Sequence, residues 1–227
     1  MQKTMETDFI YWRHLTPVGI KVEEITGRED KSGLVWLDMA RQIYCENGRD
    51  GVFRAVLHLD SGVPLLDGEQ TRISVTHTDG LLAVASLPKT PEADLREFSL
   101  RTSLGIDAER RDREQVMKVR DKFLSDEEKT LVGESLDANI IAWTSKEALY
   151  KSSLYPGLDW RKDIRLLKLP VPGAPTMLKG QEPPTVGLAE ITVPERGVVQ
   201  MELYCYYSED FCITLAYSPK CAKYNRG

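Results

Sequence analysis

The chain has 227 residues, of which 41% are hydrophobic, and its 30 Lys and Arg against 35 Asp and Glu give a formal net charge of −5. This composition excludes a disordered chain, a collagen-like repeat and a coiled rod, and the acidic balance argues against a nucleic-acid partner. At about 150 residues per domain, the length allows one large domain or two small ones.

The expected cellular location and the redox state of the cysteines follow from patterns that the sequence lacks. No window approaches the roughly 18 to 20 consecutive apolar residues of a membrane span. The start, MQKTMETDFIYW, lacks the basic and then apolar pattern of a secretion signal, so we expect a cytoplasmic protein with no membrane partner. The four cysteines, Cys45, Cys205, Cys212 and Cys221, lack the spacing of a zinc site or a disulfide framework, and we expect reduced thiols.

The first clear element is a β-hairpin. Ile73 and Val75 alternate with polar residues, and Asp79-Gly80 then leads into the apolar run 81–87, a pattern typical of two strands joined by a tight turn. His77 lies near the end of the first strand, between the hydroxyls of Thr76 and Thr78. Such a polar cluster can hold a phosphate, although a histidine at a strand end is more often a surface or capping residue. The prolines of segment 88–91 predict a break after the hairpin.

Residues 104–109 alternate between apolar and acidic side chains. Asp107 and Glu109 point to one face, which predicts a half-buried strand in which their Cα atoms lie about 6.5 to 7 Å apart. Both carboxylates can then reach one hard cation, and oxygen ligands of this kind suit Mg²⁺. The alternative is a pair of solvated carboxylates on the outer face of the strand.

Apolar residues at helical spacing predict a helix over 111–123 and a longer one over 137–152. Between them, Ser125 and Glu128 have the spacing of a capping box. The buried stripe of the longer helix is expected to be Ile140, Ile141, Thr144 and Ala148. Glu147 and Lys151 lie four residues apart on this helix, a spacing that alone indicates only a surface ion pair.

The last part of the chain is predicted to be a long loop followed by strands. Residues 170–184 hold five of the 12 prolines and predict a surface loop. The segments 186–193, 198–207 and 211–217 are rich in β-branched and aromatic residues and predict an antiparallel meander. No tandem repeat is evident in the sequence.

The motifs become more specific when they are taken together. Gly105-Ile106-Asp107-Ala108-Glu109 is followed about forty residues later by Trp143, Lys146-Glu147-Ala148 and Lys151, with weaker motifs at 62–64, 73–78 and 123–128. This set, in this order over residues 62–151, resembles the 4′-phosphopantetheinyl transferase superfamily, in which a Gly-[Ile/Val]-Asp-x-Glu strand precedes a Trp-x-x-Lys-Glu-Ala-x-x-Lys helix.

The resemblance implies an α+β fold of two similar α/β halves related by pseudo-two-fold symmetry, as in the longer class of the superfamily. The halves would be residues 1–103, on the side that binds the coenzyme A nucleotide, and residues 104–227, with the metal site and the catalytic helix. Because the second half supplies the surface that a shorter relative obtains from another subunit, we expect a monomer.

The implied reaction transfers the 4′-phosphopantetheine arm of coenzyme A to a serine of an apo acyl or peptidyl carrier protein and releases adenosine 3′,5′-bisphosphate. By the same resemblance, Asp107, Glu109 and Glu147 would hold Mg²⁺, and Glu147 would be the general base. Lys151 would contact the diphosphate, and Thr76 and His77 would hold the 3′-phosphate. Such carrier proteins serve fatty-acid, polyketide or peptide synthases.

The sequence departs from the family pattern in its N-terminal half. Val63 stands where many members have a lysine, and the arginine-rich helix of the family has only a poor match ending at Arg41, our candidate for the missing cation. Residues 110–122 contain six basic and three acidic residues, a balance that suits either a solvated helix face or docking of an acidic carrier protein. Apolar residues at Phe123, Leu124 and Leu131 are candidates for the centre of that contact.

Two other functions are compatible with the sequence. One is another Mg²⁺-dependent phosphotransferase or phosphohydrolase that uses the same carboxylates. The other is a catalytically weak homologue that only binds coenzyme A or a carrier protein, a reading to which Val63 and the poorly matched arginine helix lend some support.

Overall fold

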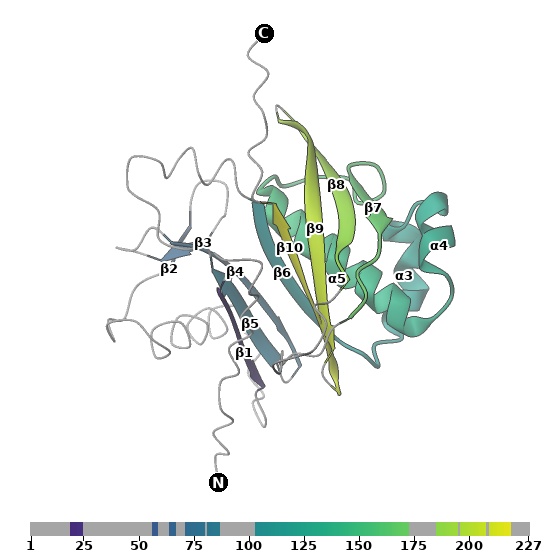
Figure 1. Ribbon diagram of the computed structural model, residues 1–227, viewed down its shortest axis with the longest axis horizontal. Helices are drawn as coiled ribbons and strands as arrows, with labels where there is room; N and C mark the ends of the chain where they lie inside the picture. The colour runs from purple at the N-terminus through teal and green to yellow at the C-terminus, as the bar shows by residue number, and fades with distance from the viewer. Residues whose placement is uncertain are drawn as a thin grey trace.

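The computed structural model of the protein describes residues 19–24, 56–58, 64–66, 71–79, 81–86, 103–172, 185–194, 196–207 and 209–218. These residues form two five-stranded antiparallel sheets and three helices, an α+β arrangement (Figure 1). The α+β class expected from the sequence is therefore confirmed.

The first sheet consists of β1 (Gly19–Glu24), β2 (Val56–His58), β3 (Pro64–Leu66), β4 (Thr71–Thr78) and β5 (Leu81–Ser86). Its strand order is β1-β5-β4-β3-β2. The pairing of Thr78 with Leu81 joins β4 and β5 directly, which confirms the predicted hairpin. On β4, the side chain of Ile73 points into the interior and is 2% exposed.

The second sheet consists of β6 (Ser103–Arg110), β7 (Ile164–Lys168), β8 (Gly187–Val193), β9 (Gly197–Tyr207) and β10 (Phe211–Ser218). Its strand order is β6-β10-β9-β8-β7. The predicted meander is confirmed as β8, β9 and β10. It is not the whole sheet, however, because β6 and β7 extend it on both sides, and β7 was not predicted.

The second sheet repeats the strand order of the first. The register repeats as well, since Glu24 pairs with Leu81 at the start of β5 as Arg110 pairs with Phe211 at the start of β10. Counting back from these pairs, Lys21 takes the place of Asp107 in the first sheet. A repeat therefore exists in the topology, although the sequence shows no tandem repeat, because backbone pairing constrains strand order far more than residue identity.

The three helices are α3 (Gln115–Phe123), α4 (Asp126–Val132) and α5 (Leu136–Ser153). Helix α3 begins later than the predicted residue 111, because residues 111–114 form turns before it. The predicted capping box at the start of α4 is confirmed: the Ser125 hydroxyl accepts from the Glu128 N–H and the Glu128 carboxylate from the Ser125 N–H. Helix α5 covers the predicted segment with one more residue at each end.

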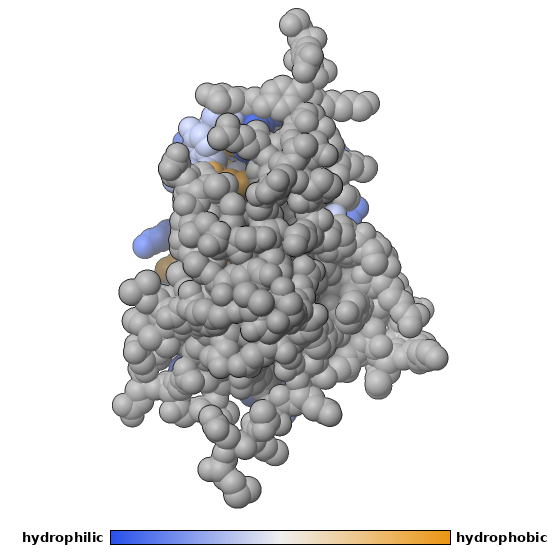
Figure 2. All heavy atoms as spheres, turned by 90° about the vertical axis from the view of Figure 1, so that its left-hand side faces the viewer, coloured by the Kyte–Doolittle hydropathy of each residue, from blue (hydrophilic) through white to orange (hydrophobic). Residues whose placement is uncertain are grey.

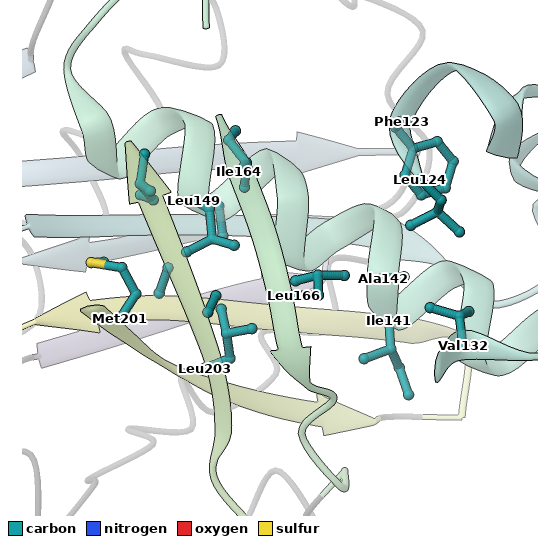
Figure 3. Close-up of a cluster of buried hydrophobic side chains, with 14 of the residues drawn as sticks. Phe123, Leu124, Val132, Ile141, Ala142, Leu149, Ile164, Leu166, Met201 and Leu203 are labelled. Atoms are coloured by element: carbon teal, nitrogen blue, oxygen red, sulfur yellow. The ribbon is translucent and has the colours of Figure 1, made fainter. Parts of the chain in front are cut away.

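Helix α5 lies against one face of the second sheet. Its predicted stripe is buried, and in Figure 3 Ile141 and Leu149 point toward Leu166 of β7 and Leu203 of β9. The opposite face of the second sheet packs its apolar side chains against Leu81 of β5. Strand β6 is consequently covered on both faces, by α5 on one and by the first sheet on the other.

Several sequence predictions lie at or beyond the limits of the described residues. The break at 88–91 and residues 173–184 of the proline-rich segment lie outside them, as do Cys45 and Cys221. Cys205 and Cys212 are buried free thiols whose sulfur atoms lie 3.5 Å apart. From the side of the first sheet, the described residues that reach the surface are mostly hydrophilic (Figure 2). None of the three helices is long and apolar enough to span a membrane.

Candidate active site

The two acidic side chains of β6 lie on the face that α5 covers. Gly105 shares this face, and an added Cβ at Gly105 would lie only 2.0 Å from the backbone oxygen of Ala148 in α5. Asp107 and Glu109 are 7% and 4% exposed. The predicted half-buried strand is therefore wrong in one respect: both faces are covered, because α5 packs over the acidic face that a lone strand would expose to water, while the first sheet covers the apolar face.

The close approach at Gly105 places Lys151 of α5 beside Asp107. The Lys151 ammonium donates to Asp107 Oδ1 at 2.7 Å and to the backbone oxygen of Ile106 at 3.2 Å. The expected surface pair between Glu147 and Lys151 does not form, because Lys151 turns toward β6. Strand and helix motifs that are about forty residues apart in the sequence are thus joined by a direct ion pair.

Glu147 lies one turn before Lys151, partly buried and facing the same acidic strand. Burial raises its pKa to about 7, and the negative charge of Asp107 adds to the rise, while Lys151 and Arg113 oppose it. Within the described residues, its carboxylate has no hydrogen bond or ion pair of its own. Glu147 is therefore an acid whose ionisation is disfavoured and which titrates near neutral pH.

Glu109 is held by three donors. Arg113, in the turn before α3, forms an ion pair with Oε2, and the Arg110 N–H donates to Oε1 at 3.0 Å. The Thr78 hydroxyl of β4 also donates to Oε1, at 3.0 Å. Neither Arg113 nor Thr78 was predicted as a partner of Glu109, although the four-residue spacing from Glu109 to Arg113 was a signal for the first.

The predicted phosphate contact Thr76 is committed to β6 in this structure. Its hydroxyl donates to Asp107 Oδ1 at 2.9 Å and accepts from the Ala108 N–H at 3.1 Å. The Ser74 hydroxyl likewise accepts from the Ile106 N–H, at 3.0 Å. These hydroxyls satisfy the outward-pointing N–H groups of β6, which is the edge strand of its sheet.

His77, the other predicted phosphate contact, lies exposed on β4, near the Lys151–Asp107 pair. Partial loss of water around the ring and the nearby Lys151 cation lower the pKa of His77, while Asp107 opposes this shift. The imidazole is therefore near Lys151 and Asp107, and its neutral form is favoured around neutral pH in the absence of a bound anion.

Lys146, next to Glu147, has a structural position that the sequence motif did not reveal. Its side chain is fully buried, and its ammonium contacts Glu128 Oε1 at 2.7 Å and the backbone oxygen of Trp160 at 2.7 Å. Burial lowers the pKa of Lys146, against the opposing charge of Glu128. Glu128 Oε1 also accepts from the Leu166 N–H at 2.7 Å. This pair ties α5 to α4 and β7, and so fixes the rotation of the helix that presents Glu147.

The basic segment 110–122 is largely paired. Arg110, Arg111, Arg113 and Arg120 form ion pairs with Asp112, Asp137, Glu109 and Glu134. Lys118 and Lys122 are exposed and form no ion pair with a described residue. The predicted apolar contact is wrong for Phe123 and Leu124, which are 1% and 0% exposed because they fill the core beneath α5; Leu131 alone of the three is exposed, at 42%.

The oxygen chemistry of the acidic cluster fits a hard divalent cation. Asp107, Glu109 and Glu147 supply carboxylate oxygens, which are ligands of the kind that such a cation prefers. In the described part of the chain no three acidic, histidine or cysteine side chains converge into a ready-made metal centre. Lys151 and Arg113 instead balance the charge. Arg41 and Val63, which concern the nucleotide side, lie outside the described residues.

Comparison with known proteins agrees with the motifs. Residues 103–213, from the first residue of β6 into β10, match the family model of the 4′-phosphopantetheinyl transferase superfamily. No curated protein matches the chain. The matched segment contains the acidic strand, all three helices and the Glu147–Lys151 motif. The chain therefore carries a domain of the 4′-phosphopantetheinyl transferase superfamily over residues 103–213.

Proposed function

We propose that this protein transfers the 4′-phosphopantetheine group of coenzyme A to a serine of an apo acyl or peptidyl carrier protein. The observation that carries the proposal is the meeting of Asp107, Glu147 and Lys151 across the β6–α5 contact, inside the segment that matches the superfamily. Two neighbouring carboxylates can accept a proton, and the ammonium group beside them can bind a diphosphate.

In this proposal Asp107, Glu109 and Glu147 hold Mg²⁺. Bound there, the cation would neutralise charge on the coenzyme A diphosphate. For this to happen Arg113 must release the Glu109 oxygen that it now contacts. Lys151, whose side chain is 31% exposed and contacts Asp107 only at Oδ1, would turn its ammonium toward the diphosphate.

Glu147 is the proposed general base. The serine oxygen of the carrier forms a bond to the phosphorus of the phosphopantetheine group, and the bond from that phosphorus to the bridging oxygen breaks. The bridging oxygen keeps the electron pair and leaves as part of adenosine 3′,5′-bisphosphate, while the serine proton passes to Glu147. Mg²⁺ beside Glu147 would lower its pKa, but an oxygen bound to the same cation has its own acidity raised, so a weak base suffices.

The nucleotide end of coenzyme A is assigned to the N-terminal half. His77 gains positive charge when a phosphate binds beside it, and Thr76 is its neighbour, so both remain the proposed contacts of the 3′-phosphate, with Arg41 as a further cation. The single hydroxyl proton of Thr76 is given to Asp107, so this hydrogen bond and donation by the same hydroxyl to the phosphate exclude each other, which makes His77 the stronger of the two candidates.

We also propose the division into halves 1–103 and 104–227 and a pseudo-two-fold relation between them. The repeated strand order and register support this arrangement, since each half contributes one complete sheet. A monomer is the corresponding assembly, because each sheet already has its counterpart within the chain.

The proposal is tested by intact-mass spectrometry of an apo carrier protein incubated with coenzyme A, Mg²⁺ and this protein. We expect the carrier to gain the mass of one phosphopantetheine group. Glu147→Gln should slow the gain by about 100- to 10,000-fold, because the general base is lost. EDTA should abolish it. Glu209→Gln, at an exposed glutamate in the turn between β9 and β10, is the matched control and should transfer at the wild-type rate.

Other outcomes point to other functions. Release of adenosine 3′,5′-bisphosphate without a carrier would indicate a phosphohydrolase. Binding of coenzyme A by calorimetry, with no mass gain on any of several carriers, would contradict the transferase proposal and identify a protein that only binds.

A further inference from the structure

The two carboxylates of β6 share a hydrogen-bonding pattern. In each, one oxygen accepts from two donors. Asp107 Oδ1 accepts from the Thr76 hydroxyl at 2.9 Å and from Lys151 at 2.7 Å. Glu109 Oε1 accepts from the Thr78 hydroxyl at 3.0 Å and from the Arg110 N–H at 3.0 Å. Since a carboxylate oxygen has about two acceptor sites, these two oxygens are filled.

The second oxygen of each carboxylate is less engaged. Among the described residues, Asp107 Oδ2 has no hydrogen bond, and Glu109 Oε2 meets only the Arg113 side chain. Arg113 is 46% exposed and can swing into solvent. The pattern therefore leaves one oxygen of each acid available to a ligand, while the other is occupied by groups that belong mostly to the protein framework.

The threonine donors come from a different sheet. Thr76 and Thr78 lie two residues apart on β4, so their side chains point to the same face, and this face meets the edge of β6. Strand β4 is a central strand of the first sheet, held by β3 on one side and β5 on the other. Each threonine has one hydroxyl proton, and each proton is given to a carboxylate.

We infer that Thr76 and Thr78 are positioning residues that determine which oxygen of Asp107 and of Glu109 faces the bound cation. The inference rests on the proposed metal-binding function of these acids. By filling Oδ1 and Oε1, the two hydroxyls fix the rotation of each carboxylate about its last bond, so that Oδ2 and Oε2 need no rearrangement when the cation binds. The first sheet thus contributes to a metal site whose ligands all belong to the second half of the chain.

Thr78 offers the cleaner test. Thr76 also accepts from the Ala108 N–H, so its replacement would leave a buried donor without a partner and disturb the fold. Thr78→Val keeps the branched shape and removes the hydroxyl, whereas Thr78→Ser keeps the hydroxyl. Thr192→Val is the matched control, because Thr192 is an exposed strand residue on β8, which β10 and β9 separate from β6.

The experiment titrates the full chain with Mn²⁺ alone. The electron paramagnetic resonance signal of the unbound ion measures how much Mn²⁺ remains free. Mn²⁺ accepts the same oxygen ligands as Mg²⁺. We expect Thr78→Val to weaken Mn²⁺ binding by about tenfold, as is typical when a partner of a metal ligand is lost. Thr78→Ser and Thr192→Val should bind like the wild type, and thermal unfolding in EDTA should be the same for Thr78→Val and Thr192→Val.

The possible failures are distinguishable. If the wild type binds Mn²⁺ and Asp107→Asn abolishes binding, but Thr78→Val binds as well as Thr192→Val, the positioning role is wrong and the metal site stands. Equal losses in Thr78→Val and Thr78→Ser would also overturn the role of the hydroxyl. If the wild type binds no Mn²⁺, or Asp107→Asn has no effect, the proposed metal site fails and the positioning role fails with it.

Discussion

The ionised carboxylate of Glu147 is less stable in the folded protein than it is in water. Its surroundings are partly buried and include Asp107, and together these raise its pKa from 4.5 to about 7. The folded state therefore binds a proton more tightly than the unfolded chain between these two values. Stability is highest below pH 4.5 as far as this residue is concerned, and falls as the pH rises toward 7.

At pH 8 without divalent metal, Glu147→Gln should consequently be more stable than the wild type, by about 3 kcal/mol from the size of the shift. The difference should vanish as the pH is lowered toward 4.5, because both side chains are then neutral. Urea unfolding at several pH values in EDTA measures it. Glu209→Gln, at an exposed position, should show no such pH-dependent difference. A constant difference between wild type and Glu147→Gln over this range would contradict the assigned cause.

At the level of elements, the site depends on how closely α5 approaches β6. Gly105 permits that approach, since a Cβ there would meet backbone atoms of α5, which cannot turn away as a side chain can. The buried Lys146–Glu128 pair then fixes the rotation of α5 from its other side. Breaking such a pair by removing one partner is strongly destabilising, because the remaining charge stays buried.

Gly105→Ala should therefore displace α5 and separate Lys151 from Asp107. We expect a loss of about 1 to 3 kcal/mol in unfolding free energy, typical of overpacking, and a loss of phosphopantetheine transfer under conditions where the variant is still folded. The control is Gly133→Ala after α4, where an added Cβ meets nothing within 4 Å but the positive φ of 71° strains the backbone. Gly133→Ala should lose stability and keep its activity, and equal loss of activity in both would argue against a role for the β6–α5 contact.

For the whole molecule, the net charge of −5 conceals a local cationic surface on α3. Most of the basic side chains near it are paired within the protein, which leaves Lys118 and Lys122 as the exposed cations that an acidic carrier would meet. Reversal at Arg113 would be a poor test of docking, because Arg113 also pairs with Glu109.

We expect the double variant Lys118→Glu and Lys122→Glu to lower kcat/KM for the carrier by about tenfold at low salt, since complementary charge mainly accelerates encounter. The loss should shrink as salt is added, while the affinity for coenzyme A stays unchanged. Lys168→Glu, exposed on β7 at the far edge of the second sheet, is the control. A loss that does not depend on salt, or none at all, would rule out steering by α3.

Local spacing of residues was enough to predict the features that lie within single elements. The hairpin before residue 81, the capping box at Ser125 and the buried stripe of α5 each follow from side chains within one element, and the structure confirms them. Motif order was enough to indicate the superfamily. Strand β7 was not predicted, because its five residues are too few to show a clear alternation of apolar and polar side chains.

How these elements meet becomes visible only once the chain is folded. The burial of Asp107 and Glu109, the hydroxyl donors on β4, the pairing of Lys151 with Asp107 and the buried Lys146–Glu128 pair all join residues 18 to 44 positions apart. Contacts at such separations leave no periodic trace in the sequence, because they depend on which faces pack and how closely. A polar residue on a predicted surface can therefore prove to be buried, as both acids of β6 are.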